Sequence, residues 1–504
     1  MQKHLFLCLI FLLVLSTNAS LAQTSTSLHN GRLAAWAKAG LATGFPTEFD
    51  HTIHLNDYGV TGNGKTNDSP GITKAIDHAK SLDGWVNIIF PAGTFVLTRQ
   101  IDLNNADKIV ISGAGPAHGP KAVPEGTTLQ FDDSQGDFMP SGHLSILFDI
   151  RGTTSAALDS VISYNHTLNQ ITVSSRTSKV RAGDLLKIEP TWVADNKFLG
   201  TMARVKDITG GRITLEDDFS LPWNDRGDIT FKVTLVQPAS NIGVEDLSIE
   251  RIGNYALSHN DNPGLTFYFR YAFNSRINNV YSTDPVSQHI TAHYSHRLEI
   301  KDSFFDDAQN HDGYGGGQGY GIALTRYTSH SLVEDNIFAK LRHSFIVSRG
   351  ASYNVFGYNY SREVTFTSGN DTGDLSIHGH YPYANLFEGN RVDRIVADAY
   401  HSVNGPFNTL LRNYSYYDDV RIEGSDYLNM SGNEGGLKEL KNSAAVTNVY
   451  EVDEPSYYLD QRPAFLDESF TWPPIGPPVG AVILTTQDIP ARRRYCGDRP
   501  DECE

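Results

Sequence analysis

The sequence predicts an all-β solenoid, a parallel β-helix, on the basis of a repeat and of its spacing. Between residues 240 and 415 a short pattern returns seven times, with apolar residues before an Asn or Asp and usually an apolar or aromatic residue after it. The markers are Asp246, Asn279, Asp302, Asn336, Asn359, Asn390 and Asn413. Successive markers are 33, 23, 34, 23, 31 and 23 residues apart, and such a spacing indicates a repeat architecture. A period near 23 is about one turn of a parallel β-solenoid, whose short strands stack coil on coil.

Long and short coils alternate, and each long coil has about ten extra residues. In solenoids, insertions map to loops on one face, often the binding face. We therefore expect the extra loops to project from one side of the stack, and the functional residues to lie near them. The Asn and Asp markers themselves are expected to be turn residues, or a stacked ladder, rather than catalytic groups.

Composition bounds the function. With 504 residues, 44 glycines and 20 % charged residues, the chain fits one long, turn-rich solenoid body. A net charge of −17 argues against a nucleic-acid partner, which needs basic patches. It still allows a polyanionic sugar, because local Arg and His clusters can override the global sign. We expect a monomer.

The first 22 residues are typical of a secretory signal. Lys3 and His4 precede an apolar run from Leu5 to Leu15, and Ser20-Leu-Ala22 fits a cleavage site. The run is too short for a transmembrane helix, so we expect a secreted or periplasmic protein with no transmembrane segment. Cys496 and Cys503 then remain, and they either close a small C-terminal loop or stay free.

After a leader at residues 23–50, residues 51–149 are expected to form an N-terminal cap and the first coils. Ser69 and Pro70 fit the N-cap and first residue of a helix, and apolar residues follow at helical spacing. Strands are expected over residues 85–90 and 93–97, and further short strands follow.

The order Asp57-Tyr-Gly, Gly62-Asn-Gly, capped helix, Phe90-Pro-Ala-Gly-Thr-Phe95 and Gly113-Ala-Gly115 resembles the start of the pectate-lyase-like proteins. This superfamily of right-handed parallel β-helices includes polygalacturonases and phage tailspikes. The resemblance covers about residues 53–131. It implies a right-handed β-helix, a helix that caps the solenoid end, and a polysaccharide substrate, but it brings no active site with it.

Residues 150–238 interrupt the coils and are predicted to form a small antiparallel β insert, because short strands there are separated by turn glycines. The main coils are assigned to residues 239–418. Residues 419–504 are expected to hold coil remnants and an extended, proline-rich tail that runs back along the body.

Two stretches within long coils are candidates for chemistry: residues 311–321, which are rich in Gly and Tyr, and residues 368–381. They lie two coils apart, so about 10 Å separates them if strands stack at about 4.8 Å. Arg326, Arg349 and His380 each stand ten residues before a marker and should form one column. His378 lies two residues before His380, and the two should share a strand face.

These residues suggest a polysaccharide lyase acting on a uronic-acid polymer. An Arg would neutralise the substrate carboxylate, and a His or Tyr would remove the adjacent proton. The catalytic candidates are His378 or His343 as the base, Tyr381 as the proton donor, His380 and Arg349. The substrate-binding candidates are Arg326, Arg342, Asp374, His401, Asn404, Tyr320 and Asp312. Asp374 would orient a histidine or bind an ion.

Other readings stay open. An inverting hydrolase of polygalacturonase type needs two carboxyl groups about 6.5–9.5 Å apart, and the candidates are Asp306, Asp307 and Asp312 with Asp374 or Glu388 opposite. A noncatalytic glycan-binding protein would use the same face with aromatic stacking. No cofactor is clearly required. A Ca²⁺ site is an alternative, although Asn370, Asp371 and Asp374 supply few of the six to eight oxygens needed.

Overall fold

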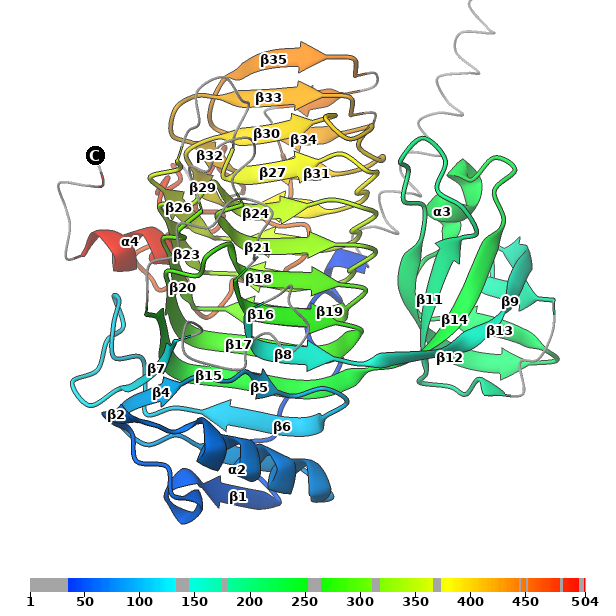
Figure 1. Ribbon diagram of the computed structural model, residues 1–504. Coiled ribbons are helices and arrows are strands. Elements are labelled where there is room, and N and C mark those ends of the chain that lie inside the picture. The colour runs from blue at the N-terminus through cyan, green and yellow to red at the C-terminus, as the bar shows by residue number, and fades with distance from the viewer. Residues whose placement is uncertain are drawn as a thin grey trace, which may run out of the picture.

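The computed structural model describes residues 35–132, 145–174, 179–252, 264–310, 318–365, 373–425, 427–443, 446–449, 452–480, 484–497 and 503. Over these residues the chain forms the predicted right-handed parallel β-helix, with a small barrel at its side (Figure 1). None of the described helices is long and apolar enough to span a membrane. The predicted signal lies outside the described residues.

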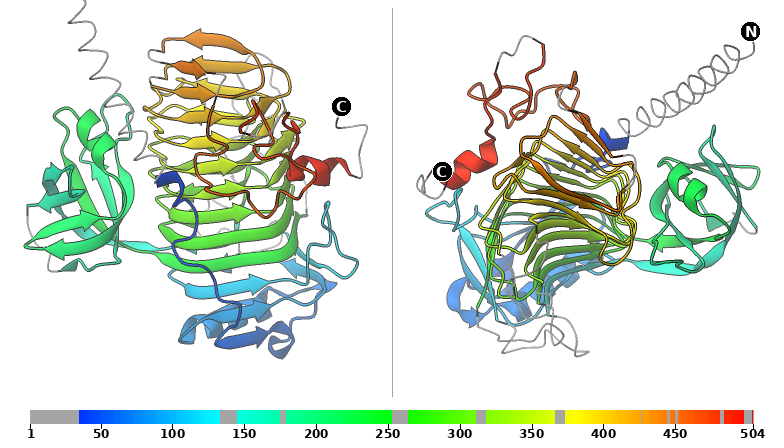
Figure 2. Two further views of the ribbon diagram at one scale, coloured as in Figure 1. Left: turned by 180° about the vertical axis from the view of Figure 1, so that it is seen from behind. Right: turned by 90° about the horizontal axis from the view of Figure 1, so that it is seen from above.

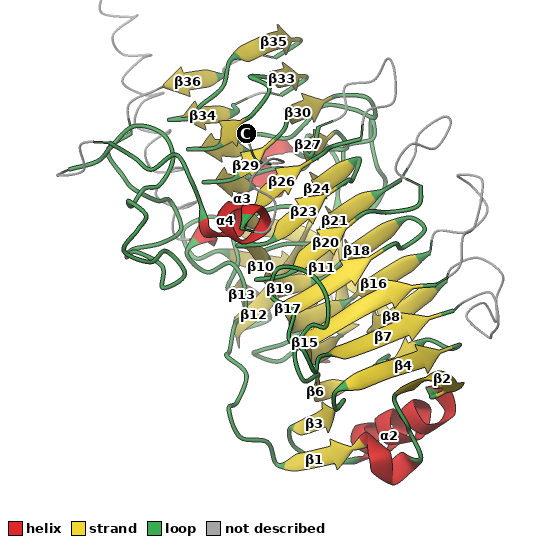
Figure 3. Cartoon of the chain, turned by 90° about the vertical axis from the view of Figure 1, so that its left-hand side faces the viewer, coloured by secondary structure: helices red, strands yellow, loops and turns green. Residues whose placement is uncertain are grey.

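The coils contribute parallel strands to three stacked columns (Figure 3). The first column consists of β1 (His51–His54), β3 (Val86–Ile89), β6 (Asp107–Ser112), β15 (Ala239–Arg251), β17 (Ala272–Thr283), β19 (His296–Lys301), β22 (Leu332–Glu334), β25 (Val355–Gly357), β28 (Leu386–Glu388), β31 (Thr409–Leu411), β34 (Asn429–Ser431) and β36 (Thr447–Val449). The second consists of β2 (Asn63–Asn67), β4 (Gly93–Leu97), β7 (Thr127–Phe131), β15, β17, β20 (Phe304–Asp306), β23 (Ile337–Ala339), β26 (Tyr360–Arg362), β29 (Arg391–Val392) and β32 (Tyr414–Ser415). The long strands β15 and β17 pass through both columns, which makes them one 20-stranded sheet, called sheet A below.

The third column is a separate ten-stranded sheet, called sheet B below. Its members are β5 (Ile101–Asp102), β8 (Ile146–Arg151), β16 (Leu265–Arg270), β18 (Gln288–His293), β21 (Tyr320–Thr325), β24 (His343–Val347), β27 (Leu375–His378), β30 (Ile395–Asp398), β33 (Val420–Glu423) and β35 (Leu437–Lys441). Its strands lie at the front of Figure 1, and their carboxyl ends point toward the barrel. Regular coils therefore continue past residue 415, to the described end of β36.

The N-terminal cap consists of the 3-10 helix η1 (Leu55–Tyr58) and α2 (Ser69–Ser81). The helix packs Ile72, Ile76 and Ala79 onto the first coil and so covers the open end of the apolar core. The N-cap residue is Asp68 rather than Ser69. The Ser69 hydroxyl instead accepts hydrogen bonds from the backbone N–H groups of Thr98 and Arg99, so it ties the helix to the neighbouring coil.

Two ladders of stacked asparagines, buried except for the last rung of the first ladder, run through the coils and fix their register. In the first, Asn336, Asn359, Asn390, Asn413 and Asn433 stack on successive coils, and each side-chain oxygen accepts from the backbone and side-chain N–H groups of the preceding rung at 2.9–3.2 Å. Each of these amides also donates to a buried carbonyl, as Asn390 does to Phe356 at 2.8 Å. Asn354, Asn385 and Asn408 form the second ladder. The expectation of a stacked ladder at the markers is confirmed for the rungs from Asn336 onward.

The β insert is a closed antiparallel barrel, with the strand order β10-β13-β12-β11-β14-β9. Its elements are β9 (Thr153–Asn165), β10 (Gln170–Val173), β11 (Leu185–Pro190), β12 (Thr201–Thr209), β13 (Arg212–Leu215), α3 (Ser220–Asp225) and β14 (Phe231–Gln237). It leaves the solenoid after β8 and returns at β15, so it stands beside the carboxyl ends of sheet B (Figure 2, right). The hydroxyl of Tyr383 donates to the carbonyl of Gly200 at 2.9 Å across this junction.

The extra residues of the long coils all enter between sheet A and sheet B, after β15, β20 and β26. This common entry point agrees with the expectation that they emerge on one side of the stack. Residues 253–263, 311–317 and 366–372 themselves lie outside the described residues.

The chain ends run along the outside of sheet A (Figure 2, left). Trp36 of the N-terminal segment is buried, and its indole N–H donates to the carbonyl of Ala384 at 2.8 Å. In the C-terminal tail, the Tyr458 hydroxyl donates to Glu334 of β22 at 2.6 Å, and α4 (Pro490–Cys496) packs near β23. Cys496 and Cys503 form a disulfide.

We expect Asn390→Ala to lower the free energy of unfolding by about 2–4 kcal/mol. The substitution leaves two N–H groups of Asn359 and the carbonyl of Phe356 buried without their hydrogen-bond partner. Urea denaturation measures this. Asn433→Ala, at the half-buried last rung, is the matched control and should cost under about 1.5 kcal/mol because water can replace its bonds. Equal losses for the two variants would show that the ladder does not hold the coils.

Candidate active site

The sequence-derived candidates gather mainly on sheet B and on the turns that follow its strands. After these strands, the turns of successive coils stack on one another through backbone hydrogen bonds. The N–H of Tyr294 donates to the carbonyl of Arg326 at 2.9 Å, that of Tyr327 to Arg349 at 3.0 Å, and that of Gly350 to His380 at 3.1 Å. Arg326, Arg349 and His380 all have positive φ, of 51°, 48° and 58°. The expected column of these three residues is therefore confirmed. The repeated turn conformation, rather than a strand face, aligns them.

His378 ends β27, and its ring forms a dyad with a carboxylate on the next coil. The Nδ1 atom of His378 lies 2.7 Å from Oδ2 of Asp398, its register partner in β30. Burial would raise the pKa of Asp398, but the hydrogen bond and charge of His378 outweigh it and lower that pKa. Asp398 therefore stays ionised and holds a proton on Nδ1, which leaves Nε2 as the basic atom of His378.

Three further histidine rings surround this dyad. The ring of His401 lies 4.9 Å from that of His378, edge to face, and 4.5 Å from that of His380, stacked at 14°. His343 lies 6.3 Å from His378 and 5.0 Å from Tyr320. Burial and the nearby Arg342 lower the pKa of His343 to about 3, and burial with Arg349 and His401 lowers the pKa of His380 to about 4. Both rings are neutral at physiological pH and bind a proton only weakly, so neither is suited to act as the general base.

Arg326 and Arg349 bring two guanidinium groups together beside these rings. Among the described residues, neither has a carboxylate within ion-pair distance. Burial, reinforced by the charge of Arg326, lowers the pKa of Arg349. The same two charges, with Arg270, add to burial in lowering the pKa of His293 to about 3. Two half-buried cations without a described counter-charge create a site of positive potential on a protein whose net charge is −17.

The structure places several candidates away from this cluster. The hydroxyl of Tyr381 donates to Asp225 of the barrel, and the ring is buried at the junction. Asn404 is buried, and its amide supports the turn at Gly379 and Ser425. Asp374 is fully buried and accepts from the backbone N–H groups of Asp393 and Arg394, both at 2.7 Å. Asp398, and not Asp374, orients a histidine.

Arg342 lies directly before β24, at the edge of the cluster. Its charge adds to the burial that lowers the pKa of His343 and opposes the burial that raises the pKa of Tyr320. Sequence reasoning missed Asp398 and Tyr400. Tyr400 is 83 % exposed, and its ring is parallel to that of His378 at 6.4 Å. His378 and Asp398 are 20 residues apart and face each other on adjacent strands of sheet B. The pair could be predicted by aligning the sheet B strands themselves, whereas the Asn and Asp markers lie elsewhere on the coil.

Three of the carboxylates suggested for a hydrolase, Glu388, Asp306 and Asp374, are engaged elsewhere in the described part of the chain. Glu388 lies in sheet A beneath the C-terminal tail, where it accepts from the backbone N–H of Tyr457 at 2.9 Å. Asp306 accepts from the hydroxyl of Tyr281 and lies 3.5 Å from Lys340. Asp312, and Asn370 and Asp371 of the calcium alternative, lie outside the described residues. Asp374 uses both of its oxygens within the protein.

Known proteins share this fold and part of this sequence. Residues 52–131 match the family model described as "Rhamnogalacturonase A/epimerase, pectate lyase-like". A stretch of 59 residues is 36 % identical to alpha-1,3-galactosidase A of Streptomyces avermitilis, covering 10 % of this chain and 9 % of that protein. The tailspike gp61 of Pseudomonas phage phi297 has a TM-score of 0.51 at 14 % identity, over 79 % of this chain and 66 % of that one. The tailspike gp49 of Pseudomonas phage LKA1 follows at a TM-score of 0.44 and 12 % identity, over 79 % and 83 %.

The chain has the parallel β-helix fold, and its residues 52–131 are similar to the family described as rhamnogalacturonase A/epimerase, pectate lyase-like. The match to the family model is confined to the cap and first coils. The chain spans less than a tenth of the curated relative and just under two thirds of the phi297 tailspike. The histidine–arginine cluster lies outside the matched residues.

The position of Glu388 generates a pH prediction. Burial raises its pKa to about 7, whereas an unfolded glutamate titrates at about 4.3. The folded state binds this proton more tightly, so the residue's contribution to stability is lost as pH rises from about 4 to about 7. We therefore expect Glu388→Gln to match the wild type near pH 4 and to exceed it by about 1–3 kcal/mol at pH 8.

Urea denaturation at both pH values measures the difference. Glu454→Gln, at an exposed position of the same tail, should show no such pH-dependent gain. A Glu388→Gln protein that is less stable than the wild type at pH 8 would mean that the ionised carboxylate is favourable in the fold.

Proposed function

We propose that the protein is an exported enzyme that cleaves an acidic polysaccharide by β-elimination. The observation that supports this most is the His378–Asp398 dyad standing beside the Arg326–Arg349 pair. A base next to a site of positive potential suits removal of a proton adjacent to a carboxylate, since the negative charge that develops needs preorganised cations. A uronic-acid residue supplies both the carboxylate and the proton.

In this reaction, Nε2 of His378 takes the proton from the carbon bearing the uronate carboxylate. The Asp398 carboxylate stabilises the imidazolium that forms, as an ionised orienting group does in other His–Asp pairs. Arg349, with Arg326 beside it, holds the carboxylate and stabilises the enolate-like intermediate. The bond to the glycosidic oxygen then breaks and leaves a carbon–carbon double bond in the sugar.

The departing oxygen requires a proton. Tyr381 was the sequence-based choice, but its hydroxyl is engaged with Asp225. We assign the role to Tyr320, whose ring packs on His343 and whose pKa is raised by burial against the opposing charges of Arg342 and Arg349. A phenol held in its protonated form can donate. Tyr400, exposed and parallel to His378, offers an apolar face on which a sugar ring can stack.

The exposed Tyr400 also favours a second candidate, noncatalytic binding of the same glycan. The two candidates differ in outcome. The purified mature protein is incubated with a panel of polyuronates and neutral glycans, and ultraviolet absorbance and new reducing ends are followed together. We expect both signals to rise on a polyuronate, because elimination creates an unsaturated product. New ends without absorbance would mean hydrolysis, and binding without either signal would support the noncatalytic candidate.

On a substrate that is cleaved, His378→Ala should lower kcat about 10²–10⁴-fold through loss of the base. Arg349→Ala should lower it about 10²–10³-fold through loss of electrostatic stabilisation. The matched control is His118→Ala, because His118 also pairs with a carboxylate, Glu250 at 2.8 Å, but lies away from the cluster. Full activity in both cluster variants would reject this site.

A further inference from the structure

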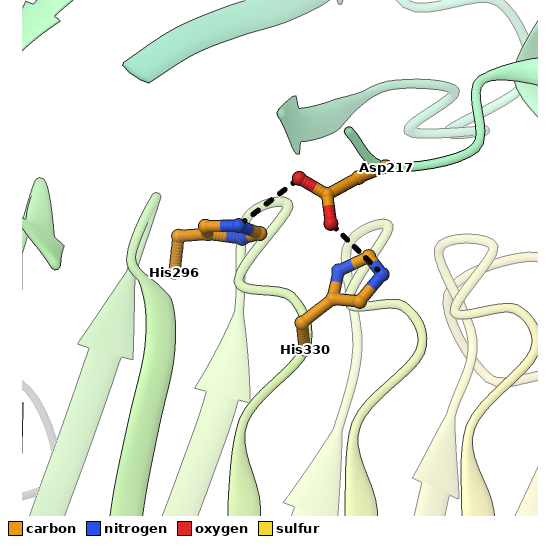
Figure 4. A group of neighbouring side chains, drawn as sticks. All are labelled: Asp217, His296 and His330. Carbon is orange, nitrogen blue, oxygen red and sulfur yellow. Dashed lines mark ion pairs between the residues drawn. The ribbon is translucent and has the colours of Figure 1, made fainter. Parts of the chain in front are cut away.

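A second histidine cluster lies at the junction between barrel and solenoid, separate from the proposed active site (Figure 4). Asp217 comes from the barrel, just after β13, whereas His296 begins β19 and His330 precedes β22. Oδ2 of Asp217 lies 3.2 Å from Nε2 of His296, and Oδ1 lies 3.5 Å from Nε2 of His330. The three side chains are 0–2 % exposed.

The ring of His296 is held with Nε2 toward the carboxylate of Asp217. The hydroxyl of Ser329 donates to the carbonyl of Met202 at 3.2 Å, and its oxygen lies 3.0 Å from Nδ1 of His296. Nδ1 is thus engaged on the far side of the ring, and Nε2 is the atom that a metal ion at Asp217 would meet.

His330 adds a second ring to the same carboxylate. Ring packing holds both in place: His296 is stacked on Phe273 at 12°, and His330 on Tyr353 at 22°. The two rings are therefore held against one buried carboxylate.

The spacing suits a small metal ion. Bonds of about 2.0–2.2 Å in a tetrahedral site place neighbouring ligand atoms about 3.3 Å apart, and here one ligand atom from each of the three residues lies within 4.8 Å of the other two. Asp217 is supported from behind by the backbone N–H of Arg204 at 3.0 Å and by Arg297 at 3.3 Å. Each carboxylate oxygen keeps a second lone pair for a ligand bond, and ligating carboxylates are commonly hydrogen-bonded in this way.

We propose that Asp217, His296 and His330 bind one divalent transition-metal ion of the zinc class, which clamps the barrel to the solenoid. Imidazole with carboxylate is a ligand set that suits zinc. The cluster is closed to solvent, so the ion has a structural role and takes no part in substrate chemistry. The clamp also positions the barrel residues that touch the active-site cluster, since Phe198 packs edge to face on His380 at 5.3 Å.

The test uses full-length mature protein without a histidine tag, incubated with ZnCl₂, dialysed exhaustively and measured for metal by mass spectrometry. We expect one zinc per chain. Removal of the zinc by a chelator should lower Tm by about 5 °C, and ZnCl₂ but not MgCl₂ should restore it. In the chelated protein, Co²⁺ should give the intense visible absorption of a tetrahedral site.

His330→Gln and Asp217→Asn should abolish zinc retention and the zinc-dependent rise in Tm. His289→Gln is the matched control, because His289 is equally buried but has both ring nitrogens bonded, to Ser282 at 2.8 Å and to the carbonyl of Asp307 at 2.7 Å. It should keep its zinc. Wild-type protein that retains well under one equivalent, or cluster variants that retain as much as the wild type, would overturn the proposal. The wild-type measurement decides even if the variants do not fold.

Discussion

The stacked asparagines are the constraint on which the rest of the structure depends. Each rung satisfies backbone groups where the coil bends, and a buried unpaired amide or carbonyl costs about 1–3 kcal/mol. The next coil can therefore lie in only one register over the last. Because the register is fixed, side chains at corresponding positions stand above one another at the strand spacing of about 4.8 Å. Arg326, Arg349 and His380 form a column for this reason.

The apolar core stabilises the solenoid, so the outside of the coils can carry charged and ionisable groups that are unfavourable for stability. Phe356 and Phe387 stack inside the solenoid at 5.0 Å, and this continuous packing stabilises the body. Outside the core, the guanidinium groups of Arg326 and Arg349 repel each other, and burial holds His343 neutral. Ionisable groups with perturbed pKa values of this kind are typical of functional sites. A bound polyanion, the proposed substrate, would reduce the repulsion between the two arginines.

The sequence was informative where a property repeats along the chain. Marker spacing predicts the coils, and counting back from the markers aligns Arg349 with His380. The sequence did not predict contacts between segments that are far apart in the chain. The barrel engages Tyr381, the tail covers Glu388, and the coil corner turns Asp374 inward. The pairing of Asp398 with His378 was not predicted, because it depends on the register of the sheet B strands and the asparagine markers give no information on that register.

The central claim is that an acidic glycan binds across β21, β24 and β27, beside the His378–Asp398 dyad. A crystal structure of the His378→Ala protein with a bound polyuronate oligosaccharide tests it most directly. The account predicts a sugar carboxylate on Arg349, with a neighbouring ring against Tyr400. An oligosaccharide seated only on sheet A or on the outer face of the barrel would contradict it.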